Sequence, residues 1–543
     1  MPTDAWPLDS PMLPPLVLRP PHGPRLVRLL VMILAILLYL PPAGWSPLTN
    51  GAEGELAAAA QELLNHGGWS VPAATPLVHG PLVPWLTRGS FALFGVNECA
   101  ARLPAVLGVA GAVWMVLWLA EGFGTVWQGF VAAMFLLCSP GMFTLGRLLT
   151  PAPLTAALLA ATVYCLQRGA EHRPTRRRWL LLAWIGWGCA TLAGGWVAGA
   201  IPAATVLLLA LFYGEARLRF RALVSWQGAL IFALTLAGMT ATGFPPGGGA
   251  GAAPDLALAP GQLLGWQGGL LFPWSLLLLP AVGDAALKLF SRRPLEWNEG
   301  LPLAWLAAGF AVALADPDLF SPLLFWPPFA VWGAGRLKTM HRRIFLCGCA
   351  LIALTACGGL YLTQHLRGLL PWLFPAKAQA FTAIPEFFWS AVTPVAFIAV
   401  LAFLMFVGVA FWAEFFQNRR FALLALIAAM IPAGFAFADI GAKFATYFSD
   451  AGMAGSIDSR RDTPVIFLDA SRFDTSSLRF YLGDDTRRAL RPCGTAADLQ
   501  AAWKPPALLV TSRSRLPFWQ QALGGRGSVV CDSGEHVLLA AQP

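Results

Sequence analysis

The sequence predicts a mainly α-helical, polytopic membrane protein that carries a small α/β domain at its C-terminal end. Three observations predict this class. Charged residues are scarce, apolar residues come in long blocks, and basic residues fall in alternate connections between those blocks. Of the 543 residues, 57% are hydrophobic and 12% are charged, which is about half the charged fraction of a typical soluble protein.

The apolar blocks are long enough to cross a membrane. LVRLLVMILAILLYL begins at Leu26 and AVTPVAFIAVLAFLMFVGVAFW begins at Ala391, and each approaches or exceeds the ~20 residues that cross a hydrocarbon core. The first block follows a Pro-rich stretch and ends in a poor cleavage site, so we predict a membrane span and not a signal peptide. We predict thirteen transmembrane helices, near residues 25–43, 100–120, 124–145, 150–167, 178–194, 197–214, 222–243, 261–282, 300–315, 319–335, 343–363, 389–412 and 420–440.

The basic residues are distributed unevenly between the two sets of connections. Twenty of the 37 Lys and Arg residues lie in one set, and the other set holds only Arg88, Arg102, Arg147, Arg367 and Lys377. Because basic residues stay on the cytoplasmic side, this predicts a multi-pass protein of a bacterial inner membrane with a cytoplasmic N-terminus and a periplasmic C-terminal domain. The net charge of +9 therefore does not indicate a nucleic-acid partner.

Three parts follow from this pattern. Residues 1–24 are a cytoplasmic Pro-rich leader that we expect to be disordered, residues 25–445 form the transmembrane domain, and residues 450–543 form the soluble domain. A long external loop spans residues 45–99. It contains an amphipathic stretch from Gly51 and an apolar stretch from Pro81. We expect both to be helices on the membrane surface; the alternative is an ordinary external loop with two short helices.

The soluble domain shows alternating strand-like and helix-like segments. TPVIFLDA, ALLVTS and GSVVCDSGEHVLLAA read as strands, and SSLRFYLG, TAADLQAAW and LPFWQQALGG read as helices, which together predict a small α/β domain. We find no glycine-rich phosphate loop, nucleophile elbow or metal-ligand spacing in it. Cys493 and Cys531 are its two cysteines, and in the periplasm they could be free or joined in a disulfide.

Several motifs resemble a known family of membrane enzymes. GAEGELAAAAQELLNHGGWSVP from Gly51, FGVNECAARLP from Phe94 and SPGMFTLGRLLTPAPLTAALL from Ser139 resemble the GT-C polyprenol-phosphate-dependent glycosyltransferases, in the group of the protein O-mannosyltransferases and the aminoarabinose lipid A transferases (glycosyltransferase family 39-like). FPWSLLLLPA and SSLRFYLGDD resemble further segments of that group. FGVNECAARLP is the most specific piece.

The resemblance implies a membrane glycosyltransferase. Such an enzyme moves a sugar from a polyprenyl-phosphate donor to a lipid, glycan or protein acceptor at the periplasmic face. An external carboxylate acts as the general base, and basic residues neutralise the phosphate leaving group. By resemblance, Glu53, with Glu55, is the candidate catalytic carboxylate. His79, Arg102 and Arg147 are the candidates for donor-phosphate or substrate binding. We expect the protein to contact membrane lipid as well as the donor. The sequence does not decide whether a divalent metal takes part.

The sequence departs from the family pattern at charged positions. Ala52 replaces the first acid of the loop helix, Val78 replaces another acid, Pro151 replaces an aspartate, Gly194 replaces a lysine, and Leu56 replaces a tyrosine. Two interpretations follow. The chain is either a divergent active transferase or a catalytically inactive GT-C protein that binds lipid or acts as a scaffold. A transporter is disfavoured, because the predicted spans contain almost no polar groups at mid-depth.

Each candidate residue also has a structural interpretation. Glu53 could stabilise the helix dipole, His79 could be an ordinary loop histidine, and Arg147 could extend from a span end toward the interface. Arg102 could pair with Glu98 instead of contacting a donor.

Three further acids are weaker candidates. Asp316 and Asp318 are either functional groups at membrane depth or part of a solvated turn. Asp255 lies in a glycine-rich stretch that we expect to be a flexible loop over the site.

Overall fold

A computed structural model shows the architecture. It describes residues 25–542 apart from 69–79, 172–174, 214–215, 217–219, 221–222, 224, 242–267, 291–296, 316–320, 366, 370–383, 385, 460–464, 470–474, 484–485, 488–489, 494 and 535. The predicted leader 1–24, the glycine-rich stretch with Asp255, and Asp316 and Asp318 lie outside the described residues.

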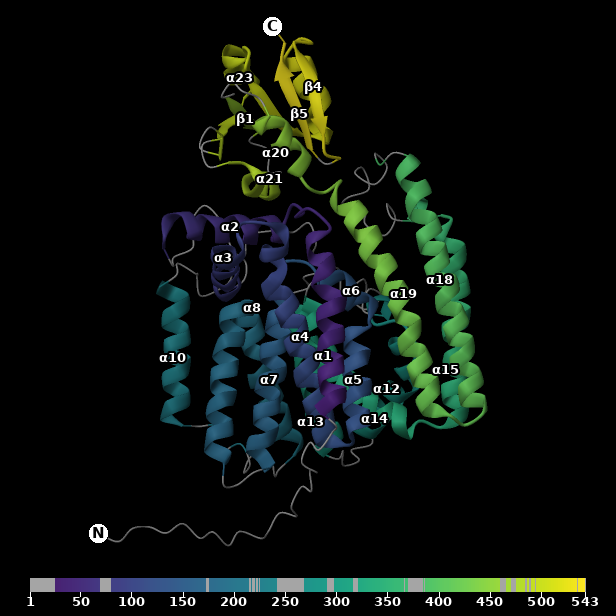
Figure 1. Cartoon of the computed structure of the whole chain (residues 1–543). Helices are drawn as coiled ribbons and strands as arrows, with labels where there is room; N and C mark the ends of the chain where they lie inside the picture. The colour runs from purple at the N-terminus through teal and green to yellow at the C-terminus, as the bar shows by residue number, and fades with distance from the viewer. Residues whose placement is uncertain are drawn as a thin grey trace, which may run out of the picture.

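A bundle of roughly parallel helices makes up most of the chain, with the C-terminal domain at one end (Figure 1). Apolar side chains from most of these helices share one large core. The helices of the bundle are α1 (Arg25–Tyr39), α4 (Glu98–Phe123), α5 (Val126–Leu137), α6 (Pro140–Leu145), α7 (Ala152–Glu171), α8 (Arg176–Phe212), α10 (Trp226–Ala241), α12 (Trp274–Phe290), α13 (Trp297–Ala315), α14 (Trp326–Thr339), α15 (Arg342–Thr363), α18 (Glu386–Phe415) and α19 (Arg419–Ala445).

Helices occupy each of the predicted membrane segments, with some shifted ends. Within the described residues, six helices are long and apolar enough to cross a membrane by themselves, so the chain is a multi-pass membrane protein and the number thirteen stays a prediction. The segment predicted at 124–145 is broken in two. Helix α5 ends at Leu137, and Ser139 caps α6 by accepting a hydrogen bond from the Met142 amide. Pro140 has no amide hydrogen with which to continue α5.

The long helix α8 is a hairpin of two helices. Gly195 has a φ of 73° inside it, which is the left-handed region that glycine tolerates. The Trp187 indole Nε1 donates a hydrogen bond of 2.8 Å to the Gly199 carbonyl, twelve residues away. In a straight helix that separation would be about 18 Å. The chain therefore folds back at Gly195, in agreement with separate predicted spans at 178–194 and 197–214.

The external loop contributes α2 (Ala52–His66) and α3 (Leu82–Phe94), preceded by the short turn η1 (Pro41–Gly44). Helix α2 lies across the end of the bundle, beneath the C-terminal domain (Figure 1). It begins after Gly51, with φ 95°, and ends at Gly67, with φ 67°. Its apolar side chains, including Leu56, are buried in a cluster with Val83 of α3 and Phe480 of the C-terminal domain. Protein therefore packs against α2 from both sides, and its position at the membrane surface stays a prediction.

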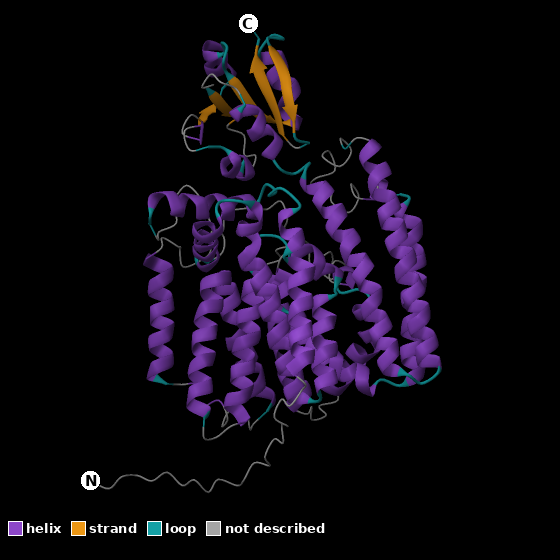
Figure 2. Ribbon diagram, in the orientation of Figure 1, coloured by secondary structure: helices purple, strands orange, loops and turns teal. Residues whose placement is uncertain are grey.

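The C-terminal domain is a five-stranded sheet with helices on both faces (Figure 2). The strand order is β2-β1-β3-β5-β4; β2, β1 and β3 are parallel and β5 and β4 are antiparallel additions. Every predicted strand and helix is present, while β2 and α20 were not predicted. The elements are α20 (Ala451–Asp458), β1 (Ile466–Asp469), α21 (Ser476–Tyr481), β2 (Leu490–Cys493), α23 (Ala496–Ala502), β3 (Leu508–Ser512), α24 (Leu516–Ala522), β4 (Gly527–Asp532) and β5 (His536–Ala541).

The two cysteines of this domain are free. Cys493 lies on β2 and Cys531 on β4, which are the two opposite edge strands of the sheet. Neighbouring strands are about 4.8 Å apart, so three intervening strands separate the thiols far beyond the reach of a disulfide. The suggested disulfide is therefore wrong, because β5 turns back between β3 and β4 and places the cysteines at opposite edges.

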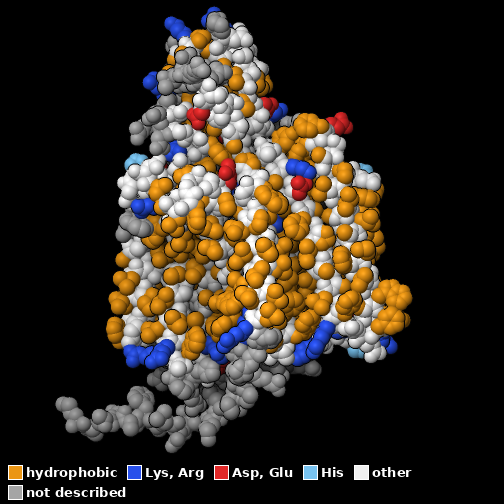
Figure 3. Space-filling model, in the orientation of Figure 1, with side chains coloured by type: hydrophobic (Ala, Val, Ile, Leu, Met, Phe, Trp, Pro, Cys, Tyr) orange, Lys and Arg blue, Asp and Glu red, His pale blue; other side chains and the backbone are white. Residues whose placement is uncertain are grey.

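The face of the bundle seen in Figure 3 is apolar over most of its height, and Lys and Arg side chains gather along its edge opposite the C-terminal domain. Two ion pairs join helices of the bundle: Arg28 Nη2 lies 2.8 Å from Glu121, and Arg336 Nη1 lies 3.0 Å from Glu299. This arrangement is the one expected of a protein embedded in lipid between two aqueous layers.

Candidate functional site

The candidate site lies where the external loop meets the ends of α1, α4 and α6. Its first feature is a buried ion pair between Glu53 and Arg102. Glu53 is 3% exposed and Arg102 is 2% exposed. Arg102 Nε donates to Glu53 Oε1 at 2.8 Å, and Arg102 Nη2 donates to Glu53 Oε2 at 3.1 Å. The pair is therefore bidentate, which is the strongest geometry between these groups.

Backbone and hydroxyl donors complete the coordination of the Glu53 carboxylate. The Leu149 amide donates to Oε1 at 2.9 Å, and the Thr49 amide and hydroxyl donate to Oε2 at 3.1 Å and 3.0 Å. The carboxylate thus accepts five hydrogen bonds, and few of its lone pairs remain for a substrate.

The Arg102 guanidinium is equally satisfied. Besides its two bonds to Glu53, Nη1 donates to the Ala43 and Ser46 carbonyls at 2.8 Å and 2.7 Å, and Nη2 donates to the Pro47 carbonyl at 3.0 Å. All five N–H groups therefore have acceptors. Arg102 joins the turn after α1, the start of α2 and the start of α4 into one rigid unit.

This environment sets the protonation state of Glu53. Burial by itself raises the pKa of the carboxyl, and the Arg102 guanidinium with the Leu149 and Thr49 amides more than offsets that effect, so the pKa of Glu53 lies below its ordinary value. A carboxylate with a lowered pKa and occupied lone pairs is a weak general base. The geometry therefore favours a role for Glu53 in positioning the loop.

The expected pairing of Arg102 with Glu98 is wrong. Glu98 Oε1 instead accepts a hydrogen bond of 3.1 Å from the Tyr481 hydroxyl, whose oxygen accepts one of 2.7 Å from the Leu48 amide. Tyr481 lies on α21, so Glu98 connects the start of α4 to the C-terminal domain. Arg102 lies four residues further along α4, where its side chain reaches the opening turn of α2 and Glu53.

The second feature of the site is Arg147, which follows α6. Its side chain is 7% exposed, and Nη2 donates to the Leu38 carbonyl at 3.1 Å. The guanidinium lies over the rings of Tyr39 and Phe143, at 5.5 Å and 5.4 Å from their centroids. Nε and Nη1 are buried without a hydrogen-bond partner, and no carboxylate among the described residues pairs with this cation.

The two features are linked through the short segment that contains Arg147 and Leu149. Because the Leu149 amide donates to Glu53, the Glu53–Arg102 pair holds that segment against the outer loop. The Tyr39 hydroxyl donates to the Leu137 carbonyl at 2.9 Å, which fixes the ring beneath the guanidinium. The Arg147 cation, with Nε and Nη1 unpaired, thus lies beside the fully hydrogen-bonded Glu53–Arg102 pair.

Two predicted site residues remain, Glu55 and His79. Glu55 lies two residues after Glu53 on α2 and is half-buried; two residues rotate its side chain about 200° from that of Glu53. His79 lies outside the described residues. Within the described part of the chain, no group of three or more His, Cys, Asp or Glu residues could hold a metal ion.

Two of the apolar substitutions are accommodated by close packing. Leu56 is buried in the cluster under the C-terminal domain. At Gly194 an added Cβ would lie 2.8 Å from both Ala198 Cβ and the Thr155 side chain, so this position has no room for a larger residue without movement. Both positions are closely packed.

The sequence did not identify several residues that matter here. Thr49, Leu149 and Tyr39 contribute through a backbone amide, a hydroxyl or a ring face, and none has a distinctive pattern. A second polar cluster was also missed. Asp450, 0% exposed, accepts a hydrogen bond of 3.0 Å from the Asn50 side chain and lies 2.9 Å from His536 Nδ1. These residues join the outer loop, the end of α19 and strand β5.

Comparisons with known proteins agree with this architecture. Residues 78–239 match the family model described as dolichyl-phosphate-mannose-protein mannosyltransferase. An undecaprenyl phosphate-alpha-4-amino-4-deoxy-L-arabinose arabinosyl transferase of Sodalis glossinidius is 29% identical over 213 residues, 37% of this chain and 38% of the relative. The corresponding transferase of Shewanella sediminis is 27% identical over 189 residues, 33% of this chain and 34% of the relative. The chain thus matches less than two fifths of the length of these relatives.

The fold extends over nearly the whole chain. The crystal structure of ArnT from Cupriavidus metallidurans bound to undecaprenyl phosphate superimposes with a TM-score of 0.77 at 19% identity, covering 95% of this chain and 99% of that chain. The apo form of the same protein also has a TM-score of 0.77, at 18% identity, covering 95% and 98%.

Proposed function

Since the chain has the GT-C fold and is related in sequence to the arabinosyl and mannosyl transferases, we propose that it is a membrane glycosyltransferase that takes a sugar from a polyprenyl-phosphate donor. The acceptor is a lipid, glycan or protein at the outer face of the membrane. In this reaction the acceptor hydroxyl attacks the anomeric carbon, the bond to the phosphate oxygen breaks, and the polyprenyl phosphate leaves as an anion.

The observation that carries the proposal is the state of Arg147. A buried guanidinium whose Nε and Nη1 nitrogens have no hydrogen-bond acceptor is costly, since unsatisfied buried donors each lose their hydration. A phosphate group restores both bonds and neutralises the charge, and the planar fork of arginine suits such bidentate contacts. The rings of Tyr39 and Phe143 hold the guanidinium in place. We therefore assign Arg147 to the phosphate of the donor, where it stabilises the leaving group.

Glu53 and Arg102 then act as positioning residues. They hold the segment that contains Arg147 through the Leu149 amide. In this assignment the general base is another group. Glu55 and His79 remain candidates for it or for substrate binding, since each belongs to the external loop.

A second candidate function is a GT-C protein that binds polyprenyl phosphate without transferring a sugar. The specific observation in its favour is the saturated Glu53 carboxylate, combined with Ala52 at the preceding position. Both candidates require the Arg147 site, and they differ only in whether a reaction follows binding.

The same proposal places the site at the periplasmic side, with the N-terminus in the cytoplasm. The band of Lys and Arg side chains at the N-terminal end of the bundle supports this orientation (Figure 3). Glu53, Arg147 and the C-terminal domain lie toward the opposite end.

The first experiment measures binding of undecaprenyl phosphate to the purified full chain. We expect the ligand to raise the thermal unfolding midpoint of the native protein, and we expect Arg147→Gln to abolish that shift. Arg367→Ala is the matched control, because Arg367 is an exposed arginine in an external connection. An unchanged shift in Arg147→Gln would remove the phosphate assignment.

The second experiment separates the two candidate functions. Mass spectrometry of lipid A and envelope glycans compares cells with the gene, without it, and with Arg147→Gln or Glu53→Gln. A sugar modification that disappears on deletion and on Arg147→Gln supports transfer. If deletion leaves every profile unchanged while the purified protein still binds the lipid, the non-catalytic candidate replaces it.

A further inference from the structure

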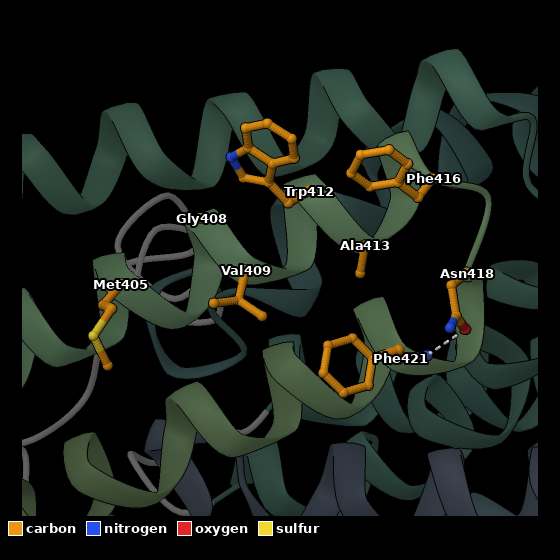
Figure 4. A pocket seen from close by; sticks show the side chains of 8 residues that line it. All are labelled: Met405, Gly408, Val409, Trp412, Ala413, Phe416, Asn418 and Phe421. Atoms are coloured by element: carbon orange, nitrogen blue, oxygen red, sulfur yellow. Dashed lines mark hydrogen bonds between the residues drawn. The ribbon is translucent and has the colours of Figure 1, made fainter.

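A second lipid-facing feature lies at the far end of the bundle from Arg147, where α18 ends and α19 begins. We call it the inner groove, and it encloses about 550 Å³ between these helices (Figure 4). Its lining is apolar apart from one amide, and includes Met405, Val409, Trp412, Phe416, Asn418 and Phe421.

The large side chains of the inner groove are strongly exposed. Trp412 is 63% exposed, Phe416 is 69% exposed and Met405 is 62% exposed. The rings of Trp412 and Phe416 stack with centroids 5.6 Å apart. Helix α18 has 30 residues, about 45 Å at 1.5 Å per residue, which exceeds the ~30 Å hydrocarbon core. These aromatic residues at its last turns therefore lie near the level of the lipid headgroups.

Basic residues lie on the helix ends next to the groove. Arg342, at the start of α15, donates to the Phe415 carbonyl at the end of α18, and Arg419 lies over the Phe345 ring of α15 at 4.3 Å. The starts of α15 and α19 are therefore neighbours of the end of α18. Glu414 is bound by Arg419 at 2.6 Å. Among the described residues, Lys338, Arg342, Arg343 and Arg420 on these helix ends have no carboxylate partner, and the Arg420 guanidinium lies 6.0 Å from the Trp127 ring centroid of α5.

The turn between the two helices has an unusual backbone. Gln417 has a φ of 63° and is the one non-glycine residue with positive φ in the described part of the chain. Its amide donates to the Glu414 carbonyl at 2.9 Å, and the Asn418 amide donates to the Ala413 carbonyl at 2.9 Å, which is the usual way to end a helix with glycine at this position. A glutamine here is strained, and it is exposed between Phe416 and Asn418, which both line the groove.

We propose that the inner groove binds an anionic phospholipid of the membrane, with one acyl chain along Met405, Trp412 and Phe421 and the phosphate at the cations of α15 and α19. The charge argues for an anionic lipid over a zwitterionic one. The side-chain amide of Gln417 donates to the same headgroup. This role explains why a residue with a strained backbone occupies a position that usually holds glycine. This site is separate from the polyprenyl-phosphate site and independent of whether the protein transfers a sugar.

The test is native mass spectrometry of the purified full chain, titrated with phosphatidylglycerol or with phosphatidylcholine of the same acyl chains. We expect the wild type to retain phosphatidylglycerol at least threefold better than phosphatidylcholine. The double variant Arg343→Ala/Arg420→Ala should remove that preference. The control Arg25→Ala/Arg178→Ala alters two exposed basic residues on other helices of the bundle and should keep it.

A third variant guards against loss of folding. Gln417→Gly relieves the left-handed backbone, so its thermal stability should match or exceed that of the wild type, while its retention of phosphatidylglycerol should fall. Equal retention of the two lipids by the wild type would overturn the proposal. A preference that survives in both the double arginine variant and Gln417→Gly would overturn it as well.

Discussion

At the residue scale, the buried cations Arg102 and Arg147 differ in how many hydrogen bonds they make. Arg102 donates all five of its N–H groups and faces the Glu53 carboxylate, whereas Arg147 makes one hydrogen bond and its Nε and Nη1 nitrogens have no acceptor. A buried charge without partners lowers the stability of the fold, so the fold tolerates Arg147 for a reason other than stability. This contrast is the physical basis for placing ligand chemistry at Arg147 and structural work at Arg102.

The pH dependence of stability should reveal the role of Glu53. Its pKa lies below the ordinary value of 4.5, so it contributes stability above that pH and loses the contribution as the pH falls through the lower value of the folded state. At pH 7 we expect Glu53→Gln to lower the unfolding free energy by roughly 3 kcal/mol, because it leaves Arg102 buried without its counter-charge. Thermal unfolding in detergent between pH 7 and pH 3.5 measures the difference in stability between the wild type and Glu53→Gln.

That difference should narrow as the pH falls below about 4.5, because the Glu53 carboxyl of the unfolded chain then takes up protons, and it is lost once the folded carboxyl is protonated as well. Glu62→Gln serves as the control, because Glu62 lies on the same helix but is only half-buried, and we expect a change within about 0.5 kcal/mol. A wild type and Glu53→Gln variant of equal stability at pH 7 would contradict a structural role for this pair.

Arg147→Met should separate function from stability. Methionine removes the buried Nε and Nη1 nitrogens that have no acceptor, which stabilises the fold by about 1–3 kcal/mol. It also removes one hydrogen bond and the contacts with two rings, which destabilises the fold. We therefore expect the thermal midpoint to stay unchanged or rise, while undecaprenyl phosphate no longer raises it. Differential scanning fluorimetry with and without the lipid measures both effects.

Arg102→Met is the matched substitution for that experiment. It removes a cation whose donors are all satisfied and leaves Glu53 buried alone, so we expect a loss of about 3–5 kcal/mol. If Arg147→Met destabilised the protein as strongly as Arg102→Met, Arg147 would be a structural residue.

At the element scale, helix α2 connects the bundle to the C-terminal domain through a close approach at Gly54. An added Cβ at Gly54 would lie 2.5 Å from the Ser476 hydroxyl and 2.6 Å from the Ser477 amide nitrogen, closer than side chains pack. We expect Gly54→Val to push α21 off α2 and to expose the junction after α19 to proteases. Limited proteolysis followed by mass spectrometry locates the new cleavage.

The control is Gly68→Ala, because an added Cβ there meets nothing within 4 Å. It should leave the digestion pattern unchanged. An unchanged digestion pattern in Gly54→Val would contradict the prediction that contact between α2 and α21 protects the junction after α19.

Elements were easier to predict than residue roles. Long apolar blocks and alternating strand patterns depend on nearby residues, so most helices and strands were predicted within a few positions. The break at Ser139 was missed because apolar residues continue on both sides of it, and β2 was missed because LRPC lacks an alternating pattern. Glu53 was recognised as important, but its role depends on Arg102 and Leu149, which are 49 and 96 positions away, and local sequence does not encode such pairings.

At the scale of the whole molecule, the proposed orientation can be checked directly. We expect a fluorescent protein fused to the N-terminus to be fluorescent in the cytoplasm, and alkaline phosphatase fused to the C-terminus to be active in the periplasm, since positive charge stays on the cytoplasmic side. Reciprocal fusions provide the control and should both be inactive. Activity of a C-terminal fusion only in the cytoplasm would place Arg147 on the wrong face for the proposed reaction.

The cluster around Asp450 gives the chain a fixed order of assembly. Asn50 leaves the ribosome early, and its partners Asp450 and His536 follow 400 and 486 residues later, so the contact is among the most distant in the sequence that a chain of this length can make. The loop that holds Asn50 therefore completes these contacts only after the last strand has been synthesised. A chain interrupted before His536 leaves Asp450 without its basic partner, and this junction then distinguishes a finished molecule from an unfinished one.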